Sequence, residues 1–496
     1  MKVILSKTDY VLFRECPKNV WYKIRKPDIY FQSELSGFEK SIIETGNEVE
    51  LEARKLFPAG ILIEGRGEES QKITKDFISK KQEILFQPIF IKDNYLAAVD
   101  ILKFESVAQG YSIYEVKSTR SIDEKAHYHD LAFQVNLLRK CGLKINKAHL
   151  IHLNSEYIRS GELNIEGLFK IVDVSAEVES IAASVNTEAA EALKYISQDS
   201  EPKGSCPCIY KGRSNHCSTF QHANPEVPEY SVHDISRIGQ SKKKLRELID
   251  SGIFSVQDIP KEFKLSDKQR NQVDAAQSGK TFIDKQEIDN FLSVISNQVS
   301  FLDYETFPAA IPRFTGYGPF NQIPFQFSLH IFKQDEIEPT HSEFIFTENK
   351  NPDEAIIEAL RKNLPSNGAV VVWYKPFEKG RNKELAERNP EYKIFLEDLN
   401  NRIIDIRDIF TEQHFIHPDF KGKTSIKNIL PVLAPELSYK ELEIQEGGNA
   451  AETWNKITNG SFDAVEKEKA INDLKIYCGL DTYAMYAIWK TLKNLI

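Results

Sequence analysis

The sequence lacks long apolar runs and is poor in cysteine. No stretch of apolar residues approaches the roughly 20 that a membrane-spanning helix requires, so we expect no membrane-embedded segment. The chain has 6 cysteines in 496 residues, too few for the dense disulfide framework of small secreted proteins. Its beginning, MKVILSKTDY, also lacks the basic, apolar and small-residue zones of a secretory signal. Together these absences predict a cytoplasmic protein.

Positive charge is not in excess either. The chain has 64 Lys and Arg against 73 Asp and Glu, which gives a formal net charge of -9. This balance excludes a surface coated in positive potential, so any contact with nucleic acid must come from local patches. It does not exclude a nuclease, because nucleases cluster carboxylates to hold divalent metal ions. The chain also lacks a Walker-type G-x-x-x-x-G-K-[ST] motif, so a helicase partner would have to be a separate chain.

What is present is the composition of an ordinary folded protein, with 41% hydrophobic and 28% charged residues. A chain of 496 residues is too long for one hydrophobic core, because domains usually run to about 100–200 residues. The pattern of helix and strand signals predicts an α/β domain over residues 1–220 and a helical connector over 221–298. A second α/β domain is expected over residues 299–496.

A first group of candidate catalytic residues lies on neighbouring predicted strands. In FQPIFIKDNYLAAVDILKF two apolar stretches flank the turn-favouring pair Asp93-Asn94, and YSIYEVKST follows, which predicts a small antiparallel sheet. Asp100 ends one strand, while Glu115 and Lys117 lie two residues apart on the next and so share a face. Two carboxylates can hold Mg2+ or Mn2+ over a scissile phosphate, and a lysine can position the attacking water. Ordinary solvated side chains at strand ends are the alternative interpretation of an isolated triple.

The sequence around Asp100, Glu115 and Lys117 resembles that of a known family. GNEVE places Glu50 on an upstream helix, and HYHDLAFQVNLL places Gln134 on the helix expected from Asp123 to about Lys140. With these features the segment resembles the RecB-like branch of the PD-(D/E)xK nucleases. The resemblance implies a restriction-endonuclease-like fold, a metal-ligand role for Glu50, with Glu48 as the alternative, and a position for Gln134 on the nucleic-acid side of the pocket.

Four cysteines bracket the same domain. Cys16 lies in SKTDYVLFRECPKNVWY, and Cys206, Cys208 and Cys217 lie in GSCPCIYKGRSNHC. One early cysteine followed much later by a tight trio resembles the iron–sulfur staple of RecB-type nucleases, including the CRISPR-associated RecB-like exonucleases. The resemblance implies a structural [4Fe–4S] cluster, and a tetrahedral Zn2+ site is the alternative because four thiolates suit either.

Three further residues need an interpretation: a histidine beside the cluster and two cysteines outside it. The C-x-C spacing is tighter than the usual trio, so His216, next to Cys217, could replace a thiolate. Cys141 and Cys478 stand alone within predicted helices, and we interpret them as core or neutral residues, because free cysteine commonly behaves as a small buried hydrophobe.

A second acidic group lies in the last domain. In VSFLDYETF, Asp303 and Glu305 are two apart on a predicted strand, and YCGLDTYAMYAIW places Tyr477 and Asp481 at i and i+4 on a helix. This pattern is similar to the DnaQ-like, RNase H-fold exonucleases of the DEDDy kind. The resemblance implies that the acids bind two Mg2+ or Mn2+ ions and that Tyr477 orients the attacking water for 3'-to-5' hydrolysis.

The fourth acid departs from that family's pattern. The family places an Asp after a middle strand, commonly following Asn and Phe, whereas this chain reads VVVWYKPFEKG and offers Glu378. We expect Glu378 to be the fourth ligand, with a geometry that could slow or abolish activity. Asp405, in RIIDIRDIF, is the alternative, although the pattern favours a strand-end or helix-capping acid there.

The connector and the order of segments complete the prediction. SRIGQSKKKLRELIDSGIFSVQDIP resembles a helix-hairpin-helix element, which contacts phosphates without reading sequence, and an ordinary helical linker with a solvated lysine face is an equal interpretation. With FLDYETF, PFQFSLH, SIKNILP and YCGLDT, the whole chain resembles a bacterial family that fuses a RecB-like nuclease to an RNase H-like domain of unknown function.

The sequence therefore predicts a DNA nuclease that hydrolyses phosphodiesters by two-metal catalysis. We expect an exonuclease acting on single-stranded DNA ends, in DNA processing, repair or defence. The alternatives are a nucleic-acid-binding scaffold with one or both sites decayed, suggested by the irregular Glu378 motif, and an RNA exonuclease.

Overall fold

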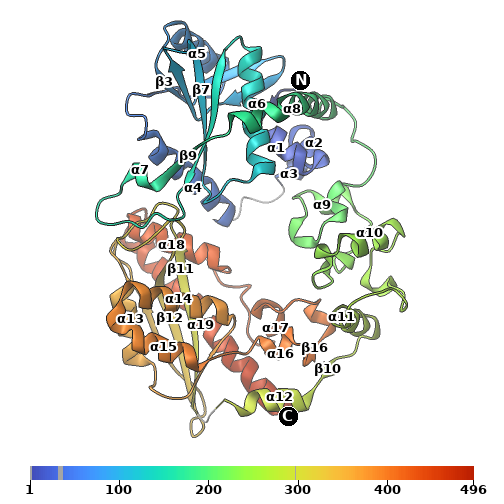
Figure 1. Cartoon of the computed structure of the whole chain (residues 1–496). Helices are drawn as coiled ribbons and strands as arrows, with labels where there is room; N and C mark the ends of the chain where they lie inside the picture. The colour runs from blue at the N-terminus through green and yellow to red at the C-terminus, as the bar shows by residue number, and fades with distance from the viewer. Residues whose placement is uncertain (1–2, 32–36, 296–297) are drawn as a thin grey trace. The chain divides into compact units, whose positions relative to one another are not determined.

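The chain folds into two compact units of mixed α/β structure (Figure 1). A computed structural model describes residues 3–31, 37–295 and 298–496. Unit 1 comprises Met1–Val227 and Ala310–Phe320, and unit 2 comprises Pro228–Ala309 and Asn321–Ile496. The predicted connector, residues 221–298, thus falls mostly within unit 2. Among the helices of the described ranges, none combines the length and apolar composition needed to cross a membrane.

Unit 1 is built on a six-stranded mixed sheet with the spatial order β2-β3-β6-β7-β8-β9. Its central strand β7 runs antiparallel to β6 and parallel to β8, and helix α6 makes the crossover between β7 and β8. The strands are β2 (Ile61–Leu62), β3 (Ile84–Phe86), β6 (Ile101–Glu105), β7 (Gly110–Lys117), β8 (Ile145–Leu153) and β9 (Phe169–Asp173). The main helices are α1 (Lys7–Glu15), α2 (Pro17–Arg25), α4 (Gly37–Arg54), α5 (Glu68–Ser79), α6 (Glu124–Lys140) and α8 (Ser175–Ile196).

The predicted small antiparallel sheet is divided between two sheets in the structure. Asp93 and Asn94 both have positive φ, as a tight hairpin turn requires, and they join β4 (Ile89–Lys92) to β5 (Tyr95–Ala98). This hairpin pairs with β1 (Leu5–Ser6) in a separate three-stranded sheet, whereas β6 and β7 belong to the larger one. The backbone NH of Gln87 donates to the carbonyl of Asp100 and so ties the hairpin to the start of β6.

The core of unit 1 lies between its sheets and helices α6 and α8. The predicted helix over Asp123 to Lys140 is confirmed as α6, whose first turn is capped by the Asp123 carboxylate accepting from the backbone NH groups of Lys125 and Ala126. Phe133 on α6 stacks on Tyr10 of α1 with ring centroids 4.9 Å apart. Because α6 follows β7 directly, its inner face lies over the end of the strand that carries Glu115 and Lys117.

Unit 2 is built on a five-stranded sheet with the order β13-β12-β11-β14-β15. The first three strands are antiparallel neighbours, and β14 and β15 run parallel to β11. Their bounds are β11 (Gln298–Pro308), β12 (Gln322–Lys333), β13 (Thr340–Ile345), β14 (Ala369–Val372) and β15 (Ile403–Asp405). The helices are α10 (Lys242–Asp250), α11 (Asp267–Ser278), α12 (Lys285–Ser293), α13 (Asp353–Asn363), α14 (Lys375–Arg388), α15 (Lys393–Arg402), α16 (Asp408–Thr411), α17 (Ile426–Leu433), α18 (Gly447–Asn459) and α19 (Ala464–Leu495).

Alternation along β11 separates an apolar core from a polar site. Leu302 and Tyr304 belong to the core cluster that contains residues of α13, α14 and α15. Asp303 and Glu305 take the alternate positions and therefore lie on the other face, where α18 and α19 contact β11. The predicted strand that carries Asp303 and Glu305 is confirmed as β11, and the predicted helix that carries Tyr477 and Asp481 is confirmed as α19.

We predict that Gly368→Ala destabilises unit 2 by about 2–3 kcal/mol. Gly368 precedes β14 with φ +88, which costs a residue with a side chain about 1–2 kcal/mol, and an added Cβ would lie 2.5 Å from the carbonyl oxygen of Gln298. Gly380→Ala within α14 is the control, because its Cβ meets nothing within 4 Å. Denaturant unfolding should show a loss only for the first variant, and equal stabilities would contradict the steric argument.

Candidate functional site

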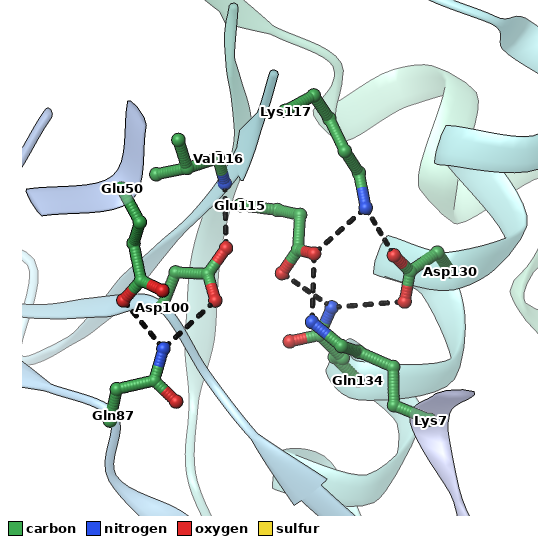
Figure 2. A network of polar contacts seen from close by, with 9 residues as sticks. All are labelled: Lys7, Glu50, Gln87, Asp100, Glu115, Val116, Lys117, Asp130 and Gln134. Carbon is green, nitrogen blue, oxygen red and sulfur yellow. Dashed lines mark hydrogen bonds and ion pairs between the residues drawn. The ribbon is translucent and has the colours of Figure 1, made fainter. Parts of the chain in front are cut away.

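The first site forms at the end of β7 in unit 1, where a polar network surrounds Glu115 (Figure 2). The Lys117 ammonium donates to Glu115 Oε1 at 2.8 Å and forms an ion pair with Asp130. Gln134 on α6 donates to Glu115 Oε2 at 2.8 Å. The alternation that places Glu115 and Lys117 on one face of the strand therefore brings both to the inner face of α6.

Asp100 and Glu50 lie beside this network and are joined by Gln87. The Gln87 amide donates to Glu50 Oε1 at 2.6 Å and to Asp100 Oδ1 at 3.2 Å (Figure 2). Asp100 Oδ2 also accepts from the backbone NH of Val116 at 2.8 Å. All five residues predicted for this site thus converge, and Gln87 ties Glu50 to Asp100, whereas the charge on the alternative, Glu48, interacts with Arg313 and Glu52.

The electrostatics of the first site follow from burial of mixed charges. Burial, followed by the charge of Glu115, raises the pKa of Asp100 to about 7. Burial also disfavours the ionised form of Glu115, but the charges of Lys117 and Lys7 outweigh it and hold the pKa of Glu115 below its usual value. Glu115 is therefore the permanent anion of the site, and Asp100 is the carboxyl that exchanges a proton near neutral pH.

Two members of this network are missed by the sequence prediction. Lys7, at the start of α1, donates to Glu115 Oε1 at 2.8 Å, and no local spacing connects it to a residue 108 positions away. Asp130 carries a detectable signal, because it precedes Gln134 by one helical turn on α6 and so shares its face.

The second site lies on the α19 face of β11 in unit 2. Half-buried Asp303 and buried Glu305 lie next to Cys478 of α19, and one carboxylate oxygen from each acid and the Cys478 sulfur all lie within 4.8 Å of one another. Asp481, one turn after Tyr477, accepts a hydrogen bond from the Tyr439 hydroxyl at 2.6 Å. The predicted residues Asp303, Glu305 and Asp481 therefore gather in one place.

Burial and mutual repulsion dominate this second site. Burial comes first, and the charge of Asp481 second, among the causes that raise the pKa values of Asp303 and Glu305 well above their usual range. Burial raises the pKa of Asp481 to about 6, although the Tyr439 hydroxyl and the charge of Lys427 oppose the rise. A cluster of this kind needs protons or a cation to be stable.

The two candidates for the fourth acid behave differently. Glu378, in the first turn of α14, is buried, and within the described chain its Oε2 atom has no hydrogen-bond partner. Burial raises its pKa to about 8, and its charge acts on Asp303 and Glu305. Asp405 ends β15 and accepts from the backbone NH groups of Lys375 and Arg407 at 2.9 and 3.1 Å, as the strand-end and capping interpretation predicts.

Three neighbours of the second site lie outside the predicted set. Cys478 is buried as expected, but its sulfur lies 4.0 Å from Asp303 Oδ2 and so adjoins the acids. Tyr439 and Lys427 reach the site from the segment before α18, without a spacing that links them to Asp481. Of these three residues, only Cys478 could have been found from the sequence, because it immediately follows Tyr477.

The four predicted cysteines form a third site, a cluster in unit 1. The sulfurs of Cys16, Cys206, Cys208 and Cys217 all lie within 4.8 Å of one another, so the group could hold a metal. Cys16 separates α1 from α2, and the other three lie on the loop after α8. His216 stacks on Phe220, and its Nε2 atom lies 3.1 Å from the carbonyl oxygen of Lys211, so His216 is engaged outside the group of four sulfurs. Cys141 packs against the core of unit 1.

Comparison with known proteins finds a similarity to a described family over about a quarter of the chain. Residues 300–425 match a family described as "Domain of unknown function (DUF2779)", and this span contains Asp303, Glu305 and Glu378 but ends before Tyr477 and Asp481. The predicted C-terminal domain of unknown function is supported to this extent.

Relatives from Ureaplasma and Mycoplasma are similar over less than half of the chain. An uncharacterised protein of Ureaplasma parvum serovar 3 is 29% identical over 233 residues, which are 42% of this chain and 33% of that protein. An uncharacterised protein of Mycoplasma genitalium is 27% identical over 241 residues, which are 45% of this chain and 36% of that protein. The chain thus spans about a third of the length of these relatives.

We predict that Cys16→Ser removes bound metal from unit 1 and lowers its thermal unfolding temperature. A metal on these four sulfurs would join α1 and α2 to the loop after α8, and the free energy of binding would stabilise the fold. Elemental analysis and thermal unfolding are the measurements. Cys141→Ser is the matched control, and equal metal content in all three proteins would contradict the prediction.

We predict that Asp303→Asn stabilises the metal-free protein by about 1 kcal/mol at mildly alkaline pH, the scale of one pKa unit. The change removes one buried negative charge from a group of neighbouring acids. It should also reduce the rise in unfolding temperature that Mg2+ causes. Glu468→Gln, on the exposed side of α19, is the control. A destabilised variant with an unchanged Mg2+ effect would contradict a metal site here.

Proposed function

We propose that the protein is a metal-dependent nuclease that hydrolyses phosphodiester bonds of DNA at single-stranded ends. The observation that carries the proposal is the group formed by half-buried Asp303 with buried Glu305 and Asp481 in unit 2. Burying several like charges is costly unless a cation compensates them, and oxygen donors are the ligands that Mg2+ and Mn2+ prefer. Substrates with bridging phosphates suit such a site, because divalent cations offset the charge of phosphoryl oxygens.

Unit 1 supports the same chemistry by a different arrangement. Asp100 immediately precedes β6, and Glu115 lies on the neighbouring strand β7, so Asp100 does not end a strand as the sequence predicted; Glu50 is tied to Asp100 through Gln87. These three acids would hold the cation. Lys117 would place its ammonium beside the scissile phosphate, with Asp130 and Glu115 fixing its direction. Gln134 and Lys7 hold the Glu115 carboxylate in place. Lys7 on α1 donates to one carboxylate oxygen, and Gln134 on α6 donates to the other.

The topology of each unit also favours nuclease folds. In the five-stranded sheet of unit 2 the first three strands in sequence, β11 to β13, form an antiparallel meander. The next two, β14 and β15, run parallel to β11 on its other side. Numbered in chain order, the strands are arranged 3-2-1-4-5, and the strand that carries Asp303 and Glu305 is in the centre. We assign this arrangement to an RNase H-like fold of DnaQ type. In unit 1 the antiparallel pair β6–β7 and the crossover β7-α6-β8 support a PD-(D/E)xK fold.

In the second site the protein side chains would orient the substrate and its attacking water. Tyr477 lies one turn before Asp481, and its hydroxyl favours the ionised form of Asp481, which lowers the pKa of that carboxyl. The Tyr477 hydroxyl would hold the water in line with the scissile bond. Lys427, whose charge acts on Glu305 and Asp481, would balance the negative charge that remains.

We assign a [4Fe–4S] cluster to the four cysteines of unit 1. Four buried or half-buried sulfurs supplied by two distant segments suit such a cluster, and a Zn2+ ion is the alternative. The cysteines would act structurally, because they lie on helices and loops away from β7. Protein purified without oxygen should contain about four iron and four sulfide per chain, whereas one zinc per chain would favour the alternative.

A second candidate function follows from Glu378. It stands where the DnaQ-like pattern has an Asp, and the longer side chain would change the geometry of a metal ligand at this position. This favours a decayed site in unit 2, which would then act as a nucleic-acid-binding scaffold.

We predict that Lys117→Ala lowers the rate of Mn2+-dependent degradation of end-labelled single-stranded DNA by about 100-fold or more if unit 1 carries the activity, the usual effect of removing one charge-stabilising group. Asp303→Ala should do the same if unit 2 carries it, and partial losses in both would indicate two working sites. Lys147→Ala, an exposed lysine paired with Asp173 on β9, is the matched control.

The same assay on RNA strands of matched sequence shows whether the protein degrades DNA or RNA faster. Faster degradation of RNA would replace the DNA assignment. A wild-type protein loaded with iron and Mn2+ that degrades neither strand would overturn the nuclease proposal in favour of the scaffold.

A further inference from the structure

Unit 2 contains a groove of about 580 Å3 that neither acidic site uses. One wall is formed by the segment from Tyr230 to Arg237 and the first turns of α11, and the other by residues 407–424 around α16 and β16 (Phe415–Ile416). Figure 1 shows α11 beside α16 and β16. We call this cavity the basic groove. Its volume is in the range of sites that enclose small ligands.

One wall of the basic groove is held together by two buried glutamines of α11. Gln272 Nε2 donates to the Tyr230 hydroxyl at 3.0 Å, and its Oε1 accepts from the backbone NH of Ser236 at 2.9 Å. Gln269 donates to the Ser236 carbonyl at 2.9 Å. Gly422 belongs to the opposite wall. A Cβ at this position would lie 2.0 Å from Gln272 Nε2, so a glycine here allows that wall to come close to Gln272. The groove is therefore preformed.

The lining of the groove is positively charged in an otherwise acidic protein. Its charged side chains are four cations, Arg237, Lys268, Arg407 and Lys423, and one acid, Asp267. Lys268 pairs with Glu412 at 2.8 Å. Arg237 and Lys423 are exposed, and neither has an ion-pair partner among the residues that the structure describes. Unpaired cations in a concave site attract anions such as phosphates.

Aromatic side chains also line the groove. Phe410 and Phe420 are buried beneath the groove, and the rings of Tyr230 and His417 are only partly buried at its sides. Arg407 places its guanidinium 5.3 Å from the ring centre of Tyr374. Cations together with accessible rings, here those of Tyr230 and His417, are the features with which proteins bind single strands, because phosphates take the cations and bases stack on the rings.

The chain runs directly from the groove to the second acidic site. Lys423 lines the groove, and Lys427, four residues later in the first turn of α17, acts on Glu305 and Asp481. A second connection starts at Arg407, which lies two residues after Asp405 at the end of β15. The Asp405 carboxylate accepts from the first backbone NH of α14, the helix that carries Glu378. Both connections are short, so a bound strand could extend from one place to the other.

We propose that the basic groove binds a single-stranded nucleic acid, with its phosphates on Arg237 and Lys423, and delivers the end of that strand to Asp303, Glu305 and Asp481. The proposal rests on the proposed nuclease function, since it names the path of that enzyme's substrate.

The test measures binding of a fluorescein-labelled oligothymidylate by anisotropy, in EDTA so that no strand is cut. The double variant Arg237→Gln/Lys423→Gln should raise Kd about tenfold or more. It should reduce the slope of log Kd against log salt by about 1.4, because each single-strand phosphate contact contributes about 0.7. The control is Lys285→Gln/Lys362→Gln, which removes two exposed lysines of unit 2 outside the groove. A Kd and slope equal to those of the control would overturn the groove assignment.

Two further arms separate the possible failures. Thymidine monophosphate should compete with the strand only weakly, and competition as strong as that of the oligonucleotide would overturn the strand assignment in favour of a nucleotide site. Hydrolysis of p-nitrophenyl thymidine 5'-phosphate, which is too small to need the groove, should be unchanged in the groove variant. If the ester is hydrolysed but strand binding is unaffected, the groove proposal fails and the nuclease proposal stands. If wild type hydrolyses neither ester nor strand, the nuclease proposal fails.

Discussion

Holding several carboxylates together away from water is the constraint on which both candidate sites depend. In unit 1 the cost is offset by cations, because Lys7 and Lys117 both contact Glu115. In unit 2 the compensation is weaker, and burial raises the pKa values of Asp303 and Glu305 well above their usual range. The two sites therefore differ in how firmly the protein fixes their charge, and unit 2 has the stronger need for a bound cation or proton.

The rest of each unit is organised to keep these acids in place. Each site combines a central strand with a helix packed across its end: β7 with α6 in unit 1, and β11 with α19 in unit 2. The opposite face of β11 carries an apolar core, which anchors the strand while its alternate residues serve the site. The cysteine cluster similarly joins the first helices of unit 1 to the loop after α8. Sites built on strands and helices are positioned more rigidly than sites on loops.

The family match covers the central strand of unit 2 but not the helix that completes its site. Residues 300–425 include Asp303 and Glu305, whereas Asp481 comes from α19 beyond that span. The described function of the matched family is unknown, so activity is inferred from the geometry of the acids. The basic groove gives unit 2 a feature that a bare carboxylate cluster lacks: a preformed, cationic surface that leads to the acids along residues 423–427.

The sequence by itself determined the helices and strands that carry the acids, and the local pairs Glu115/Lys117, Asp303/Glu305 and Tyr477/Asp481. Short-range periodicity fixes which residues share a face, and that information is written in neighbouring positions. Tertiary structure alone decided that Lys7 meets Glu115, that Tyr439 donates to Asp481, and that Glu378, rather than the capping Asp405, is the buried acid with an unpaired oxygen. These contacts join segments that are far apart in the chain, where packing and the pairing of buried charge select the partner and no local spacing records it.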